Sequence, residues 1–221
     1  MSIFLLNSYV YEVADIPVEQ IANAEAMSFN GTDSYIDCGS FSAYDNGDLS
    51  VSMWIKKSTM GTYEYALSNS GSSAIAGFDI VFENSFRRVS IGRRTRTSDV
   101  STGFTDIGFT LNTWHNIAFT YQDSTRTLKV YMDSVLQSTT IGSASTNSAS
   151  LNLTIGSYQG TSNFTSGDID EVAIFDTALS ANKIQEIYDA TAVVNGVPQT
   201  ANLFTGGLDS SLVYWNRMGD S

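Results

Sequence analysis

The stretch GDIDEVAIFDTALSANKIQEIY, residues Gly167–Tyr188, decides the fold that we expect for this chain. Its first half contains an apolar run at Ile169–Ile174, which has the length of a β-strand. Its second half predicts a helix at Ala181–Ala190, because Ser180 can cap it and apolar residues recur three and four positions apart. A helix this short persists only when it packs on a larger structure. The stretch therefore predicts a strand and then a helix that docks on the rest of the domain.

Strand patterns recur between turn signals elsewhere in the chain. Leu49–Ile55 alternates apolar and other residues, which predicts a half-buried strand with Trp54 on the opposite side from Leu49. The same reasoning predicts strands at Gly77–Glu83, Arg87–Gly92, Ile117–Tyr121, Leu128–Met132 and Leu151–Ile155. Several short strands separated by turns favour an all-β sandwich.

Two further segments, read together with the first, support a family resemblance. They are FNGTDSYIDCG (Phe29–Gly39) and WHNIAFTYQDSTRTLKVYMDSVL (Trp114–Leu136). In this order the three segments resemble the laminin-G-like, concanavalin-A-like jelly-roll family, of the kind found in marine bacteriophage structural proteins. The resemblance implies a two-sheet antiparallel jelly-roll sandwich with one short C-terminal helix and extended terminal arms. This fold serves lectins, hydrolases and structural proteins alike, so it does not by itself imply a ligand.

The pattern divides the chain into three parts. Residues 1–25 have no regular period and predict an N-terminal arm or anchor, and residues 26–190 form the jelly-roll domain. Residues 191–221 predict a linker followed by the start of a second repeat, because GLDSSLVYWNRMGDS (Gly207–Ser221) resembles a segment that opens such domains in the family. The alternative is that this tail packs elsewhere.

Composition excludes several classes of protein. The formal net charge is −12, which argues against nucleic acid as a partner, since phosphate binding needs a basic face. Cys38 is the only cysteine, so we expect a buried strand residue and no intrachain disulfide. No apolar run approaches the ~20 residues of a membrane span. Without a recognisable signal peptide, the chain is expected in a virion made in the host cytoplasm; an extracellular location is the alternative.

Catalytic patterns are weak, and we predict that the protein is not an enzyme. Glycoside hydrolases need two carboxylates that flank the sugar bond. Asp168 and Asp170 share a face of the predicted strand, but Glu171 points the other way. His115, the only histidine, follows Trp114 at a strand start and is better explained as a structural residue than as a general base.

Calcium is the cofactor that the resemblance suggests, because family members often bind one Ca²⁺ near the segment that matches Gly167–Val172. Calcium takes six to eight oxygen ligands. Asp33, Asp168 and Asp170 are the candidate ligands. The alternatives are that Asp33 only stabilises its own turn and that Asp170 only holds the connection to the helix.

Basic and aromatic residues give two further candidates for binding. A cluster of arginines could contact an anionic glycan or an acidic neighbour, although strand alternation splits it between two faces; it comprises Arg87, Arg88, Arg93, Arg94 and Arg96. Tyr63, Tyr65 and Tyr158 are predicted in loops, where their rings could stack on sugars or form a protein interface.

These observations predict a non-catalytic structural or adhesion protein of a bacteriophage virion. Its expected partners are other virion proteins and a host-surface glycan, and we expect a homo-oligomer. A carbohydrate-binding module of a secreted bacterial protein is the alternative, and a glycoside hydrolase is the third reading.

Overall fold

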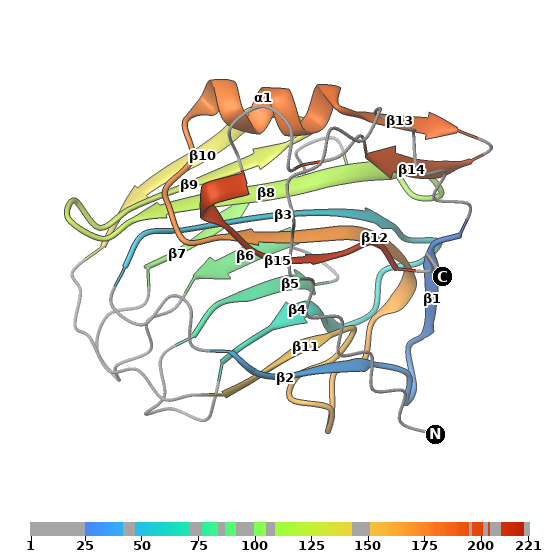
Figure 1. The fold of residues 1–221 in the computed structure, drawn as a ribbon. Coiled ribbons are helices and arrows are strands. Elements are labelled where there is room, and N and C mark those ends of the chain that lie inside the picture. The colour runs from blue at the N-terminus through green and yellow to red at the C-terminus, as the bar shows by residue number, and fades with distance from the viewer. Residues whose placement is uncertain are drawn as a thin grey trace.

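The structure is a computed structural model that describes residues 25–41, 47–70, 77–83, 87–91, 100–104, 109–142, 151–194, 196–200, 203 and 209–218. Within these residues, strands form two packed antiparallel sheets and a helix lies on the outside of one of them (Figure 1). The predicted all-β, two-sheet jelly roll with one short helix is confirmed. The predicted arm at residues 1–25 lies outside the described residues, apart from its last position.

Each sheet brings together strands that are far apart in the sequence. The first sheet runs in the order β1 (Met27–Asn30), β12 (Ser166–Phe175), β3 (Leu49–Lys56), β8 (Trp114–Gln122), β9 (Thr127–Met132) and β10 (Val135–Ile141), and β15 (Leu212–Asn216) also pairs with β12. The second sheet runs in the order β2 (Ile36–Phe41), β11 (Leu151–Ile155), β4 (Tyr63–Ser68), β5 (Asp79–Glu83), β6 (Arg87–Ile91) and β7 (Val100–Phe104).

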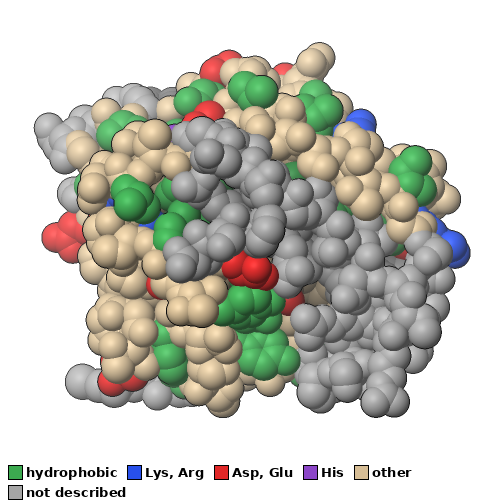
Figure 2. Space-filling view, turned by 180° about the vertical axis from the view of Figure 1, so that it is seen from behind, with side chains coloured by type: hydrophobic (Ala, Val, Ile, Leu, Met, Phe, Trp, Pro, Cys, Tyr) green, Lys and Arg blue, Asp and Glu red, His purple; other side chains and the backbone are tan. Residues whose placement is uncertain are grey.

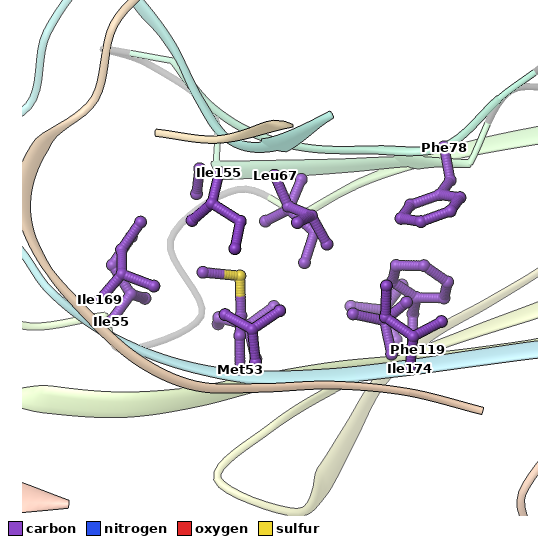
Figure 3. Close-up of a cluster of buried hydrophobic side chains, with 14 of the residues drawn as sticks. Met53, Ile55, Leu67, Phe78, Phe119, Ile155, Ile169 and Ile174 are labelled. Atoms are coloured by element: carbon purple, nitrogen blue, oxygen red, sulfur yellow. The ribbon is translucent and has the colours of Figure 1, made fainter. Parts of the chain in front are cut away.

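The main core lies between the two sheets. Alternate residues of each strand point inward, so Met53, Phe119 and Ile174 of the first sheet face Leu67 and Phe78 of the second (Figure 3). These side chains are all fully or almost fully buried. The apolar alternation seen in the sequence is therefore the inner face of the sandwich.

The outer face of the first sheet is also covered. Helix α1 (Ala181–Asp189) lies across it and buries Ile184 and Ile187 in a second apolar cluster with Phe175. Ser180 caps the helix as predicted, because its side chain accepts a hydrogen bond from the Lys183 N–H. This cover corrects the prediction of a half-buried β3: all of that strand except its last residue is buried, on both faces.

Strand β12 is interrupted by a bulge between Asp170 and Ala173. Glu171 takes a left-handed backbone angle there, with φ of 50°. The extra residue turns both Ile169 and Val172 toward the main core. The bulge also decides where the acidic side chains of this segment go, which a regular alternation could not foresee.

The described part of residues 191–221 folds onto the same domain. Strands β13 (Thr191–Val194) and β14 (Val197–Thr200) form a hairpin, and a short 3₁₀ helix (Asp209–Ser211) leads into β15. Since β15 pairs with Val172–Phe175 of β12, this part of Gly207–Ser221 is a strand of the first sheet, which agrees with the alternative that the tail packs elsewhere.

In the view of Figure 2, the hydrophobic side chains of the described residues form several separate groups among polar ones. The most exposed large apolar residues are Ile141 and Val135, both on β10. Among the residues that the structure describes, no helix is long and apolar enough to cross a membrane.

Candidate functional site

A surface cavity of about 410 Å³ lies where three connections meet: the turn after β1, the start of β4 and the loop between β11 and β12. Its lining residues are Gly31, Gly61, Thr62, Tyr63, Glu64, Asn163 and Phe164. Strand pairing brings these segments together from positions more than 100 residues apart. Concave sites with aromatic walls and a few polar groups are typical of small-molecule binding.

The loop between β11 and β12 forms one wall of the cavity. It leaves β11 at Gly156, whose φ of 85° and close contact with the Phe29 ring leave no room for a side chain. Further along, the Asn163 carbonyl accepts the Tyr65 N–H at 2.9 Å, and the Asn163 amide donates to the Tyr63 carbonyl at 3.2 Å. The loop is therefore fastened to β4 by two hydrogen bonds from one residue.

Five rings surround this loop, and we call them the aromatic cluster: Tyr35, Tyr63, Tyr65, Tyr158 and Phe164. Ring centroids lie 5.4 Å apart for Tyr63 and Tyr65, 4.9 Å for Tyr65 and Tyr158, and 6.2 Å for Tyr35 and Phe164. Tyr65 is buried, whereas Tyr35 is 44% exposed. The cluster thus runs from the interior to the surface, with Tyr63 and Phe164 on the cavity wall.

Glu64 forms the floor of the cavity and is held on several sides. One carboxylate oxygen, Oε2, accepts the Lys57 ammonium at 2.7 Å and the Gly61 N–H at 2.9 Å. The other, Oε1, accepts the Ser166 N–H at 2.9 Å. Lys57 belongs to the segment after β3 and Ser166 to β12, so the carboxylate connects the second sheet to the first.

Lys57 is completely buried. Its Nζ donates to the Ser166 carbonyl at 2.6 Å and lies 5.6 Å from the centre of the Phe82 ring. Burial lowers the pKa of this ammonium, and the hydrogen bond and charge of Glu64 offset part of that shift. A buried cation and a nearly buried anion thus neutralise each other beneath the cavity.

Two predicted calcium ligands, Asp33 and Asp168, lie in the segments next to the cavity: the turn after β1 and the start of β12. Asp33 follows Asn30, which organises the turn: its Oδ1 accepts backbone N–H groups and its Nδ2 donates to Asp33 Oδ1 at 2.8 Å. Asp168 accepts the Ser28 hydroxyl at 2.6 Å and pairs with Lys56 at 2.8 Å. Both carboxylates therefore have protein partners.

The third predicted ligand, Asp170, is fully buried on β12, and its Oδ1 accepts the N–H of Glu171. The described residues contain no group of three or more His, Cys, Asp or Glu side chains that could hold a metal ion. Asp33, Asp168 and Asp170 are therefore not gathered into one such group. Calcium binding stays a prediction of the sequence.

We expected Glu171 on the opposite face from Asp168 and Asp170. In the structure its side chain binds residues of β15 and of the segment that follows it. Its carboxylate accepts the Trp215 indole N–H at 2.8 Å and the Arg217 Nε–H at 3.3 Å. The Arg217 guanidinium also lies over the Trp215 ring. This buried carboxylate fastens the C-terminal strand to the sheet.

His115 lies between a carboxylate and a loop. Its Nδ1 is 2.7 Å from Asp133 Oδ2, and its Nε2 accepts the Thr110 N–H at 3.1 Å, with the Thr110 hydroxyl 3.0 Å away. Because a backbone N–H already points at Nε2, this nitrogen is an acceptor that holds the loop before β8. The contacts are those of a structural residue.

The other predicted binding residues have different outcomes. Tyr63 and Tyr65 are on β4, so their placement in a loop was wrong, whereas Tyr158 is in the loop between β11 and β12. Of the arginine cluster, 93, 94 and 96 lie outside the described residues, as do the side chains of Arg87 and Arg88.

Sequence reasoning missed the residues that build the cavity, above all Lys57, Glu64, Asn163 and Phe164. Two aromatic residues flank Glu64 in the sequence, which was the one local signal. No spacing in the chain relates Glu64 to Asn163, because their place in the same cavity depends on how β4 and the loop after β11 meet.

Comparison with known proteins places the fold. No curated protein sequence matches this chain. Among solved structures, the botulinum neurotoxin serotype D binding domain is similar over 78% of this chain and 45% of its own, with 16% identity and a TM-score of 0.59. Domain 4 of AbnA, a GH43 extracellular arabinanase from Geobacillus stearothermophilus solved with arabinotriose, is similar over 73% of this chain and 75% of its own, with 18% identity and a TM-score of 0.56.

A mutant of the NanB sialidase from Streptococcus pneumoniae is similar over 73% of this chain and 27% of its own, with 14% identity and a TM-score of 0.60. This chain thus spans less than half the length of the toxin and sialidase chains that it matches. At these identities the likeness concerns the fold. A family model matches residues 30–185, and on that match the chain belongs to the concanavalin A-like lectin/glucanases superfamily.

Proposed function

We propose that this domain binds carbohydrate without catalysis, at the cavity and the aromatic cluster beside it. The observation that carries the proposal is the pair of rings, Tyr63 and Phe164, on the wall of a cavity whose floor is polar. Aromatic faces bury the apolar side of a sugar, while hydroxyl and carbonyl groups orient it. Among the solved structures of the same fold is one with arabinotriose bound, which makes that trisaccharide the first ligand to test.

The cavity favours binding over hydrolysis. Glycosidic cleavage requires two carboxylates, one on each side of the bond. Among the lining residues that the structure describes, Glu64 is the one carboxylate, and it is already held by two backbone N–H groups and Lys57. A carboxylate fixed in this way orients a ligand more readily than it transfers a proton.

The test is a glycan array followed by isothermal titration of each ligand found. Tyr63→Ala and Phe164→Ala are expected to weaken binding about tenfold or more, the equivalent of about 1.4 kcal/mol. Leu136→Ala, which removes an exposed side chain from β10 at the far edge of the first sheet, is the matched control and should bind normally. Normal binding by both aromatic variants would contradict the assignment of the site, and release of reducing sugar by the wild type would contradict a non-catalytic role.

We place this binding on a bacteriophage virion, where the domain would contact other virion proteins or a host-surface glycan as a homo-oligomer. The sequence resemblance to phage structural proteins supports this setting. Capsid, portal or tail genes beside the coding gene, and the protein in purified particles, are the expected findings. An upstream export signal in the full gene would instead favour a carbohydrate-binding module of a secreted protein.

Calcium is the cofactor to test, because the sequence predicts it. If Asp168 and Asp170 bind Ca²⁺, added calcium raises the melting temperature by mass action, and Asp168→Asn removes that rise. A melting temperature that added calcium does not change would contradict the prediction. Thermal melts with calcium and with a chelator decide between the two outcomes.

A further inference from the structure

We infer that the cavity selects uncharged, hydroxyl-rich ligands and rejects anionic ones such as sialylated or sulfated glycans. The inference rests on the proposed function and goes further by naming the ligand class. It is argued from the polar atoms of those described residues that face the cavity.

The cation nearest to the cavity floor cannot reach a ligand. The side chain of Lys57 is 0% exposed, and its ammonium is directed to Glu64 Oε2, the Ser166 carbonyl and the Phe82 ring. The preceding residue, Lys56, is paired with Asp168 at 2.8 Å and lies over the Trp114 ring. None of the seven lining residues is itself a lysine or arginine. An anionic group in the cavity would therefore meet no counter-charge from the described residues of its walls.

Instead, the cavity offers hydrogen-bond acceptors. Glu64 Oε1 accepts one bond, from the Ser166 N–H, and a carboxylate oxygen can accept a second. Asn163 directs its Nδ2 to the Tyr63 carbonyl, which leaves its Oδ1 as the amide atom that can meet a ligand. Thr62 adds an exposed hydroxyl at the rim. Acceptors of this kind match the O–H donors of a neutral sugar.

The surroundings add to this preference. Asp33 is exposed in the same turn as Gly31, and the chain as a whole carries a net charge of −12. Burying an anion beside the already neutralised pair of Lys57 and Glu64 would remove the anion from water without a partner among the described residues. Lactose and arabinotriose are uncharged, so their binding does not have this desolvation cost.

The experiment compares matched ligands by isothermal titration: arabinotriose, lactose, and lactose derivatives that carry sialic acid or sulfate. We expect the neutral sugars to bind at least about tenfold more tightly than the anionic derivatives. Thr62→Lys places a cation at the rim of the cavity and is expected to reduce the ratio of the affinity for neutral sugars to the affinity for anionic sugars. Thr139→Lys, on an exposed position of β10, changes the net charge equally but should leave the ratio unchanged.

The outcomes separate this inference from the proposed function. If the anionic derivatives bind as tightly as lactose, or more tightly, and Tyr63→Ala still weakens binding, the selectivity is wrong and the binding site stands. If Thr62→Lys and Thr139→Lys change the ratio equally, the selectivity comes from net charge and not from the cavity, which also overturns the inference. Binding of no glycan of either class would overturn the proposed function itself.

Discussion

Two glycines with the same backbone angle separate the effect of local strain from the effect of packing. Gly156 and Gly196 have φ of 85° and 84°. A Cβ atom at Gly156 would lie 2.3 Å from the Phe29 ring, whereas one at Gly196 would have nothing within 4 Å. We expect Gly196→Ala to lower the free energy of unfolding by about 1 kcal/mol and Gly156→Ala by about 2–4 kcal/mol, measured by urea denaturation. Equal losses would show that the contact with Phe29 is unimportant.

The buried pair of Lys57 and Glu64 is expected to be costly to break from one side. Glu64→Gln leaves a buried ammonium without its counter-charge and should lower the free energy of unfolding by about 3 kcal/mol. Adding Lys57→Met to the same chain should recover part of that loss. The exposed pair of Lys183 and Glu186 is the control, and Lys183→Ala should cost less than about 1 kcal/mol. A Glu64→Gln variant as stable as wild type would contradict this role.

Cys38 predicts how stability changes at alkaline pH. Burial raises the pKa of its thiol from 9.0 to about 11, and the hydrogen bond with Tyr214 offsets part of that rise. Above pH 9 the unfolded chain loses this proton while the folded chain keeps it. The stability due to Cys38 is therefore fully present below pH 9 and is lost as the pH rises to about 11.

The measurement is urea denaturation at intervals between pH 8 and about 11. Cys38→Ala should flatten the fall in stability over this range. Burial also raises the pKa of Tyr214, so Tyr214→Phe is the companion variant and should flatten a further part of the fall. If neither variant changes how steeply stability falls with pH, Cys38 and Tyr214 are not the cause of that fall.

Among the elements, β15 is the strand whose contribution to stability could not be predicted from the sequence. It pairs with β12, and Met218, two residues beyond its end, is buried in the main core. Met218→Ala is expected to lower the free energy of unfolding by about 2–4 kcal/mol, because it leaves a cavity between the sheets. Val213→Ala, on an exposed position of the same strand, should cost less than about 1 kcal/mol. Chemical denaturation of both variants distinguishes a strand of the domain from a loosely attached tail.

Elements were predictable where one local pattern was sufficient. Helix α1 begins after Ser180 and ends within one residue of the prediction, because its cap and its apolar spacing are both local. The half-buried appearance of β3 was misleading, since Ser50, Ser52 and Trp54 lie under other elements and not in water. Trp54, for example, stacks on Tyr188 of the helix. A strand cannot indicate from its own residues what covers its second face.

For the whole molecule, the net charge of −12 is the property with a measurable consequence. Like charges repel within the compact state, and salt screens that repulsion. Raising sodium chloride from about 10 mM to about 150 mM at pH 7 is therefore expected to raise the melting temperature by a few degrees. Near pH 4.2, the isoelectric point, the same change should have less effect. A melting temperature that falls with salt at pH 7 would mean that attractive pairs dominate.

The sequence by itself determined the class of fold, the positions of several strands and the short helix, because alternation, turn residues and caps act over a few neighbouring positions. The tertiary structure decided the rest. Glu64, Lys57, Asn163 and Phe164 meet only when β3, β4 and the loop after β11 are assembled, and β15 becomes part of the first sheet only by pairing with β12. Such contacts depend on pairing between distant strands, and no local spacing encodes them.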